Sequence, residues 1–488
     1  IPFPPLSLTR PDGAPNYSNV ATAVALTKTT VNIPDAYEET STFDFSGTIA
    51  FDQKTEYRSM SFLTVPLTTR QNSLIGVLQL INARDTENRV VPFSPSVQPV
   101  IEALSSQAAV ALENDMLLRS QKELLDSFIE LIAGSIDAKS AYTGGHCQRV
   151  PMVTEMLAKA ACASTEGVFS DFNLNKDEWY ELHLAGWLHD CGKVTTPEYV
   201  VDKATKLETI YNRIHEIRTR FEVLRRDAEI EMWKKKAGRE EDDAVLEAKF
   251  AARCAELEAA FKLIAETNMG GEFLDSETAE KVVAIGTQSW TRNFDRTLGL
   301  SWEEVERTKG SNAGSVPAQE LLLDDRKDHK TENYNLGEIY NLSIQRGTLT
   351  EEERAKINDH ISVTISMLEQ LPFPKHLKRV PEIAGGHHEK MDGTGYPNGL
   401  TRDQMSWPAR MMAIADIFEA LTASDRPYKK AKKLSDCLQI MSFMKKDAHI
   451  DPDLFDLFLT SGVWKEYADL FLDPAQIDAV DITKYLDA

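Results

Sequence analysis

A long segment without helix breakers most constrains how this chain can fold. Residues 100–132 contain neither proline nor glycine, and their apolar side chains recur at intervals of three and four residues. That spacing places the apolar side chains on one face of an α-helix, so we predict one long amphipathic helix over residues 97–140. Either this helix packs on its own domain, or it pairs with its twin in a homodimer.

The bulk composition limits the class of protein. A chain of 488 residues is too long for a single core and predicts two or three domains. The net charge of −22 disfavours binding to nucleic-acid polymers and to anionic membranes. We find neither a signal peptide nor an apolar run of membrane-spanning length. The first residue is Ile1 rather than Met, so we expect that a preceding segment was removed.

The five cysteines form no CxxC pair and leave one over. This pattern is typical of reduced thiols rather than of a disulfide framework, so we predict a cytoplasmic protein. The part before the long helix carries two β-rich runs, residues 60–67 and 74–82, separated by a polar turn, which predicts an α/β domain.

The part after the long helix is predominantly helical. The highly charged residues 208–270 predict an antiparallel helix pair that turns near Ala237 and Gly238, with its charges on a solvated face. Thr350 and Glu353 predict a capping box at the start of a later helix. Gly192 is interpreted as the C-cap of the helix that precedes it.

Five of the ten histidines lie next to acids, to glycines or to each other, whereas lone histidines such as His183, His329, His376 and His449 fit core or surface positions. Adjacent imidazoles are costly to bury unless something binds them. Imidazole nitrogen and carboxylate oxygen suit divalent iron, manganese or zinc. In the pair His189-Asp190, the aspartate has two oxygens and can bridge two ions, an arrangement that serves phosphoryl chemistry.

The motifs "HDCGK" (189–193) and "HHEKMDGTGYP" (387–397) together resemble the HD-GYP subgroup of the HD phosphohydrolases. The segments 136–150 and 416–431 resemble the opening helix and a late helix of that family. The resemblance covers about 123–207 and 336–470. It implies an all-α helical bundle that hydrolyses cyclic di-GMP, with two divalent metal ions, iron or manganese, as cofactors.

The resemblance also implies roles for single residues. Asp190 and Lys193 are the expected catalytic residues, with Lys193 beside the substrate phosphate. Arg426 and Lys429 are expected to grip the phosphates of the dinucleotide, and Tyr396 to shape a loop over the site. Some family members hold a third metal through a glutamate, but Tyr142 occupies that place here. The expected metal ligands are His146, His189, Asp190 and Asp416 for one ion and Asp190, His360, His387 and His388 for the other.

The chain departs from the family in one large segment. Residues 208–335 look inserted between Asp190 and His360, and they make the exact cyclic dinucleotide an open question. His215, at the start of this insert, is a rival to His360 as the ligand. We prefer His360 because the residues after it continue like the family helix. Glu389 and Asp392 are interpreted as loop or supporting residues rather than as direct ligands.

The segments 31–38, 51–67 and 75–83 resemble a GAF domain whose first part is missing. Asn82 is followed by Ala83 and Arg84 instead of the Asn-Lys signature of cyclic-nucleotide binders, so its small-molecule ligand is unknown. The expected architecture is multidomain. It comprises a truncated α/β GAF domain (1–105), a linker helix (106–140), an all-α HD-GYP domain with a large, mostly helical insertion (141–470), and a C-terminal tail (471–488).

These expectations define a cytoplasmic signalling phosphodiesterase, regulated by its GAF domain, that converts cyclic di-GMP to linear pGpG, with a further cut to GMP left open. One alternative keeps the chemistry and changes the substrate to cyclic GMP-AMP. Another is a sensor that binds a cyclic dinucleotide without turnover. The expected partners are this dinucleotide, the GAF ligand and a second copy of the chain.

Overall fold

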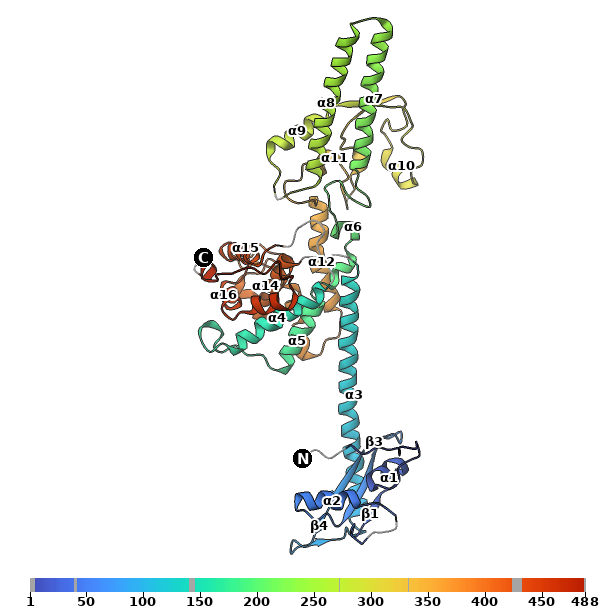
Figure 1. Cartoon of the computed structure of the whole chain (residues 1–488), viewed down its shortest axis with the longest axis vertical. Coiled ribbons are helices and arrows are strands. Elements are labelled where there is room, and N and C mark those ends of the chain that lie inside the picture. Colours follow the sequence, from blue (N-terminus) through green and yellow to red (C-terminus); the bar gives the residue numbers. More distant parts are fainter. Residues whose placement is uncertain are drawn as a thin grey trace. The chain divides into compact units, whose positions relative to one another are not determined.

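The protein is described from a computed structural model that covers residues 5–38, 42–139, 145–271, 273–331, 333–423 and 432–486. Two compact units make up the chain, Ile1–Phe128 and Ile129–Ala488. Helix α3, Gln98–Asp137, begins in the first unit and ends in the second, and it is unbroken over its 40 residues (Figure 1). The predicted long helix is therefore confirmed. No helix among the described residues combines the length and the apolar character that crossing a bilayer requires.

The first unit is built on a small antiparallel sheet. The predicted β-rich runs form its central strand β2 and its edge strand β3, in a register that pairs Phe62 with Ile81. Helix α1 covers the sheet and buries Val20 and Val24 against Phe45 and Phe62. The elements before α3 are α1 Val20–Thr27, β1 Val31–Ile33, α2 Ser46–Thr55, β2 Phe62–Thr68, β3 Leu74–Ile81, β4 Ala83–Arg84 and β5 Val90–Val91.

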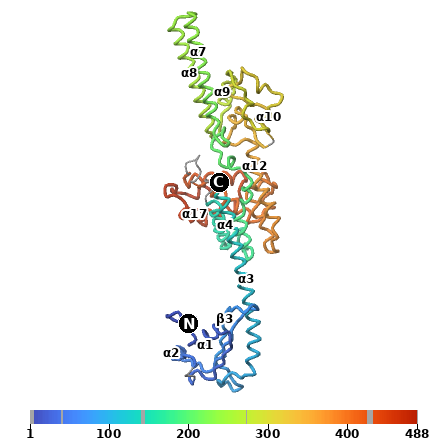
Figure 2. The backbone as a smooth tube through the Cα atoms, turned by 90° about the vertical axis from the view of Figure 1, so that its right-hand side faces the viewer, coloured from blue at the N-terminus to red at the C-terminus, as the bar shows by residue number. Residues whose placement is uncertain are grey.

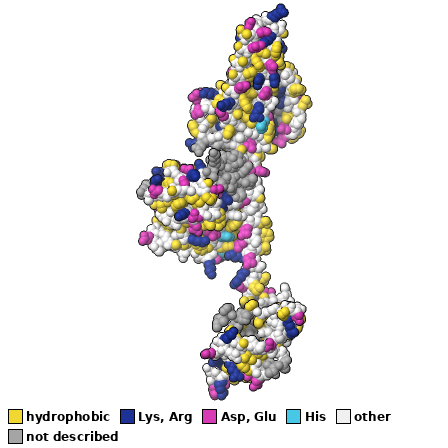
Figure 3. All heavy atoms as spheres, in the orientation of Figure 1, with side chains coloured by type: hydrophobic (Ala, Val, Ile, Leu, Met, Phe, Trp, Pro, Cys, Tyr) yellow, Lys and Arg dark blue, Asp and Glu magenta, His cyan; other side chains and the backbone are white. Residues whose placement is uncertain are grey.

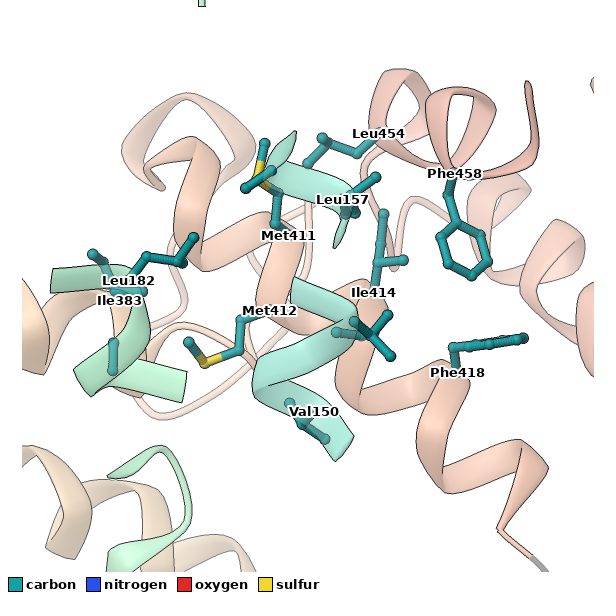
Figure 4. Close-up of a cluster of buried hydrophobic side chains, with 14 of the residues drawn as sticks. Val150, Leu157, Leu182, Ile383, Met411, Met412, Ile414, Phe418, Leu454 and Phe458 are labelled. Carbon is teal, nitrogen blue, oxygen red and sulfur yellow. The ribbon is translucent and has the colours of Figure 1, made fainter. Parts of the chain in front are cut away.

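The second unit has a helical core. Helix α14 lies at its centre, and its Met411, Ile414 and Phe418 pack against side chains of neighbouring helices such as Leu157 and Phe458 (Figure 4). The end of α3 contributes buried residues to the same core. The core helices are α4 His146–Ala163, α5 Lys176–Leu188, α6 Glu198–Val201, α12 Glu351–Glu369, α13 Val380–Gly385, α14 Trp407–Thr422, α15 Leu434–Lys446, α16 Pro452–Thr460, α17 Val463–Phe471 and α18 Thr483–Leu486, with the 3₁₀ turns η1 Gly167–Phe169, η2 Cys191–Thr195, η4 Lys375–Leu377 and η5 Arg402–Gln404.

The end of the chain belongs to this core. Residues 471–488 were predicted to form a tail outside the domain, but Tyr485 is only 5% exposed and lies in the core cluster. The Gln476 side chain donates hydrogen bonds to the carbonyl oxygens of Thr422 and Lys432. These contacts attach the last segment to the end of α14 and to the start of α15.

The predicted insert has a separate apolar core. Ile217, Phe221 and Leu224 of α7 recur at helical spacing and pack against Leu257 and Ile264 of α8. Its elements are α7 Ile214–Gly238, α8 Asp243–Asn268, α9 Ser276–Gly286, β6 Ser289–Arg292, α10 Trp302–Thr308, β7 Ala318–Leu321, η3 Lys327–His329 and α11 Glu338–Leu342.

Helices α7 and α8 form the antiparallel pair that the sequence predicts, with the turn after Gly238 (Figures 1 and 2). Basic and acidic side chains alternate over the visible face of this hairpin (Figure 3). Several of them pair across short distances, as Lys235 does with Glu231 and Arg226 with Glu229. The charge run is therefore a solvated, self-paired surface, because its positive charges are balanced locally.

Candidate metal centre

Five separate segments bring histidines and carboxylates to one place in the second unit. His146 is the first residue of α4, and His189 and Asp190 follow the end of α5. His360 lies in the middle of α12, His387 and His388 follow α13, and Asp416 lies on α14. Asp190 and His387 are almost fully buried.

A glycine permits the closest of these approaches. A Cβ atom on Gly192 would lie 1.9 Å from the carbonyl oxygen of His360, so only glycine allows η2 to pack directly on α12. The backbone N–H of Gly192 also donates a hydrogen bond to the Thr364 hydroxyl oxygen, at 2.9 Å. The prediction that Gly192 caps α5 is wrong, because α5 ends at Leu188 and Gly192 lies inside η2. Its role is to bring Asp190 next to His360.

The first group of polar atoms surrounds one oxygen of Asp190. Asp190 Oδ2 lies 3.1 Å from His146 Nε2 and 3.3 Å from His189 Nε2. His146 Nε2 also lies 3.3 Å from Asp416 Oδ1. The ligand atoms of His146, His189 and Asp190 all lie within 4.8 Å of one another, so a single ion fits among them.

The second group surrounds the other oxygen of the same carboxylate. Asp190 Oδ1 lies 3.2 Å from His360 Nε2. The ligand atoms of His360, His387 and His388 lie within 4.8 Å of one another. Asp190 thus presents one oxygen to each group, which is the geometry of a bridging ligand.

Hydrogen bonds fix which ring nitrogen of these histidines carries the proton. The Nδ1 atoms of His189, His360 and His387 each contact the backbone carbonyl oxygen three residues earlier. A carbonyl oxygen can only accept, so each Nδ1 is the protonated nitrogen. The Nε2 atom of a neutral ring is then a free lone pair, and it is this atom that faces the centre.

Three buried atoms of the centre have no hydrogen-bond partner among the described residues: Asp190 Oδ1, His360 Nε2 and His387 Nε2. Leaving such groups unpaired is costly. Asp190 Oδ1 and His360 Nε2 face each other as two acceptors, which repel unless a cation lies between them. Imidazole nitrogens and carboxylate oxygens are also the donor set that divalent transition metals prefer. The residues of both groups therefore fit a divalent metal ion.

The charges of the centre support the same interpretation. Burial alone would raise the pKa of Asp190, but Lys193 and the neighbouring histidines hold it well below its usual value. Burial lowers the pKa of His387 well below its usual range and that of His388 to about 4, so both rings are neutral and ready to bind a cation at pH 7. Near neutral pH, Asp190 supplies the negative charge and these histidines supply lone pairs.

The remaining predicted site residues lie as follows. Lys193 Nζ donates to Asp190 Oδ2 at 2.5 Å, and its side chain is 26% exposed. The ring of Tyr396 stacks on His388 with 4.9 Å between centroids. The rival His215 is an exposed residue of α7 that contacts Arg218, so His360 and not His215 lies in the centre. Arg426, Lys429 and Tyr142 lie outside the described residues.

The loop of residues 389–400 is shaped by two acids, as the sequence suggests. Glu389 is 1% exposed, and its carboxylate accepts hydrogen bonds from the backbone N–H groups of Asn398 and Leu400. Asp392 accepts from the backbone and the hydroxyl of Thr394. Both acids are committed to the loop backbone, and the loop holds Tyr396 against His388.

Two further residues of the centre, Glu419 and Arg149, are not indicated by the motifs of the sequence. Glu419 Oε2 contacts His146 Nδ1 at 2.5 Å, and its other oxygen accepts from Arg149 Nε at 2.7 Å. Burial alone would raise the pKa of Glu419, but His146 and Arg149 lower it. Glu419 is therefore an ionised acceptor that orients His146. Its position three residues after Asp416, on the same face of a helix, was the available signal.

Replacing Glu419 by glutamine is expected to weaken metal binding by about 10- to 100-fold, because the amide loses the charge that orients His146 and makes it more basic. Metal affinity is measured by competition with a chromogenic chelator. The matched control is Glu155→Gln, which removes a carboxylate that contacts a histidine elsewhere, His183, at 3.0 Å. An equal loss of affinity in both variants would contradict the orienting role.

Comparison with known proteins agrees with this geometry. The family model of the GAF domain matches residues 5–112, and that of the HD domain matches residues 303–454. The chain therefore combines a region that matches the GAF domain with a region that matches the HD domain. The HD match contains His360, His387, His388 and Asp416, whereas His189 and Asp190 precede it.

Curated proteins similar to this chain are named as cyclic-dinucleotide phosphodiesterases. A 3'3'-cGAMP-specific phosphodiesterase of Vibrio cholerae is 42% identical over 110 residues, 22% of this chain and 23% of the relative. A cyclic di-GMP phosphodiesterase of Pseudomonas aeruginosa is 34% identical over 135 residues, which are 28% of this chain and 31% of the relative. A cyclic di-GMP phosphodiesterase of Thermotoga maritima is 31% identical over 128 residues, which are 26% of this chain and 33% of the relative. The chain therefore spans no more than a third of the length of these relatives.

The two groups of the HD domain are expected to bind metal with different pH dependence. Burial alone would lower the pKa of His146, but contacts with three carboxylates raise it well above the usual value. Below that pKa an ion must displace a proton from His146, so affinity at its group falls about tenfold per pH unit. The group of His387 and His388, whose pKa values are lowered, has no proton to displace from these rings above about pH 5.

Metal content measured between pH 8 and pH 5 checks this expectation. The ion beside His146 should be lost first as the pH falls, and calorimetry in buffers of different ionisation enthalpy should record proton release for that ion. Loss of both ions with one common pH dependence would contradict it.

Proposed function

We propose that this protein is a metal-dependent phosphodiesterase that hydrolyses cyclic di-GMP to linear pGpG. The observation that carries the proposal is the position of Asp190, with one carboxylate oxygen in each of two histidine groups whose Nε2 atoms face inward. Such paired sites, each with imidazole nitrogen donors and a shared carboxylate, suit in-line attack on a phosphodiester. The relatives named as cyclic di-GMP phosphodiesterases support this substrate.

We assign two divalent ions, iron or manganese, to the two groups. When bound, the ions would supply Lewis acidity that activates a water and offsets charge on the phosphoryl oxygens. The ligand set of the first ion is His146, His189, Asp190 and Asp416, and that of the second is Asp190, His360, His387 and His388.

The protein's own residues then bind and orient the substrate. Burial alone would lower the pKa of Lys193, but Asp190 and Asp416 raise it, so the ammonium stays charged beside the centre. Its remaining N–H groups can donate to a phosphate oxygen. Tyr396, stacked on His388, forms one wall of the site, and Arg426 and Lys429 are proposed to grip the second phosphate.

Cyclic GMP-AMP is the second candidate substrate, because three of the relatives are named as phosphodiesterases specific for it. The deciding experiment measures turnover of cyclic di-GMP and of the cyclic GMP-AMP isomers by iron- or manganese-loaded protein, with metal counted on the same sample. Formation of a linear dinucleotide with about two metals per chain supports the enzyme and names its substrate. Full metal occupancy without turnover of any of them supports the sensor alternative.

We propose in addition that α3 joins two copies of the chain and transmits the state of the GAF domain, whose small-molecule ligand is unnamed. Leu117, Leu124 and Leu131 are spaced by seven residues and are 61%, 58% and 64% exposed. Leu118 and Leu125 repeat the same spacing. A seven-residue apolar repeat left uncovered on a long helix suits a two-stranded coiled coil.

Replacing Leu117 and Leu124 by glutamate is expected to weaken the dimer by about 100-fold or more, because two charges per chain would enter the apolar seam. Sedimentation equilibrium measures the dissociation constant. Ser120→Glu, on an exposed polar position of the same helix, is the control. A monomeric parent protein, or an unchanged dimer in the leucine variant, would contradict this role of α3.

A further inference from the structure

The insert contains a cavity that shares no residue with the metal centre. Its volume is about 720 Å³, which is in the range of small-molecule sites. Its walls come from the start of α7, from β6 and β7, from α10 and η3, and from the segment before α11.

Five arginines supply the cationic groups of this cavity. Trp290 and Tyr334 add aromatic surface to the walls. Five acids also line it, and several have partners: Glu338 forms a two-bond pair with the lining Arg220, and Glu304 caps α10. Glu320 pairs with Arg292 at 2.7 Å and lies 3.5 Å from the lining Arg296. The lining arginines are Arg213, Arg220, Arg296, Arg307 and Arg326.

Four buried donors of the lining have no hydrogen-bond partner among the described residues: Arg213 Nη2, Arg296 Nε, Arg326 Nε and His329 Nδ1. Arg326 Nη2 contacts His329 Nε2, and because a guanidinium can only donate, the proton of the neutral ring sits on Nδ1. All four atoms are therefore N–H donors without acceptors. Each such buried group is costly unless a ligand supplies the acceptor.

The charges around the cavity also favour an anionic ligand. Burial, together with the charge of the neighbouring Arg326, lowers the pKa of His329 to about 4. Burial and the charge of Arg296 lower the pKa of Arg326. The guanidinium groups thus repel one another, and Asp328 lies 3.6 Å from Arg326 Nε, beyond hydrogen-bond distance. An anion among them would relieve this repulsion.

We propose that the cavity of the insert binds a small phosphorylated ligand. A phosphate group offers three acceptor oxygens and up to two negative charges, which match guanidinium donors that converge from several elements. These four donor atoms are buried from solvent in the structure. The arginine guanidinium groups therefore rotate toward the ligand when it binds. The aromatic side chains of Trp290 and Tyr334 suit a planar ring attached to the phosphate, as in a nucleotide.

Arg213 connects this cavity with the two ends of the insert. Its Nε donates to the carbonyl oxygen of Leu207 at 3.0 Å, and its Nη1 donates to that of Leu336. Leu207 precedes the insert and Leu336 follows it, so one guanidinium joins the two connections to the helical core of the second unit. A phosphate bound to Nη2 of the same group would stabilise both connections.

Calorimetric titration of the full-length protein with orthophosphate and with GMP, at constant ionic strength, tests the proposal. Binding of both identifies the phosphate as the recognised group, and tighter binding of GMP adds recognition of the ring. The double variant Arg296→Gln/Arg326→Gln should weaken either ligand by about tenfold or more, since it removes two charge-assisted donors. The matched control Arg225→Gln/Arg226→Gln changes the charge equally on the exposed face of α7 and should bind as the parent does.

Hydrogen exchange of the parent protein locates the site without relying on a variant that could misfold. GMP or orthophosphate should slow exchange in residues 207–220 and 288–338. The proposal is overturned if neither ligand binds at millimolar concentration, if the two double variants bind equally, or if protection is confined to the metal centre. Neither the titration nor the hydrogen exchange depends on turnover of cyclic dinucleotides. Failure of this proposal is therefore distinguishable from failure of the phosphodiesterase assignment.

Discussion

Replacing Asp190 by alanine is expected to remove bound metal and phosphodiesterase activity together. Among the described residues, Asp190 is the one side chain whose oxygens lie within 3.3 Å of histidine nitrogens in both groups, at His146, His189 and His360. Without it each group retains nitrogen donors but loses the charge that draws a cation in. We expect a loss of activity on the order of 10³-fold or more, with metal content near zero.

The matched variant is Asp190→Asn, which keeps the shape of the side chain and removes its charge. It should lose metal almost as completely, while circular dichroism of both variants stays that of the parent because the helices are held by the apolar core. Metal content by mass spectrometry and turnover are measured on the same samples. Turnover in either variant at the level of the parent protein would overturn the assignment of the centre.

The sequence was sufficient for the elements whose signals are local. The breaker-free segment gave α3, the β-rich runs gave β2 and β3, and Thr350 with Glu353 forms the predicted capping box. Adjacent polar pairs also drew attention to the histidines that the fold brings together. Such residues are recognisable because burying them without a ligand is unfavourable, whatever the surrounding fold.

What the sequence could not provide depends on contacts between distant segments. Glu419 lies 273 positions from His146. Its spacing from Asp416 places it on the face of α14 that carries this predicted ligand, but does not reveal which ring its carboxylate orients. Gly192 was interpreted as a cap because a close approach to α12 cannot be inferred from its neighbours in the chain. The cavity of the insert also escaped notice, since its arginines are scattered from residue 213 to residue 326.

The junction between the insert and the HD core depends on a buried ion pair. Lys203 Nζ donates to both oxygens of Glu353, at 2.9 and 2.7 Å, and to Asn341 Oδ1 at 3.2 Å. The lysine side chain is 0% exposed and that of the glutamate 6%. Burial lowers the pKa of Lys203, and Glu353 opposes that change. This pair connects the segment after Asp190 with the first turn of α12, the helix that carries His360.

Replacing Lys203 by methionine is therefore expected to lower the free energy of unfolding by about 3–5 kcal/mol, because Glu353 would remain charged and buried without its cation. The double variant Lys203→Met/Glu353→Leu should lose less than the sum of the single changes. Lys356→Met, which removes an exposed lysine 3.7 Å from Asp359 on α12, should cost no more than about 1 kcal/mol. Urea denaturation measures all of these. Equal losses for the two lysine variants, or additive losses in the double variant, would contradict a buried pair. Strong non-additivity would show that Lys203 and Glu353 stabilise the protein as a matched pair of charges, and that this pair holds the segment after Asp190 against the helix that carries His360.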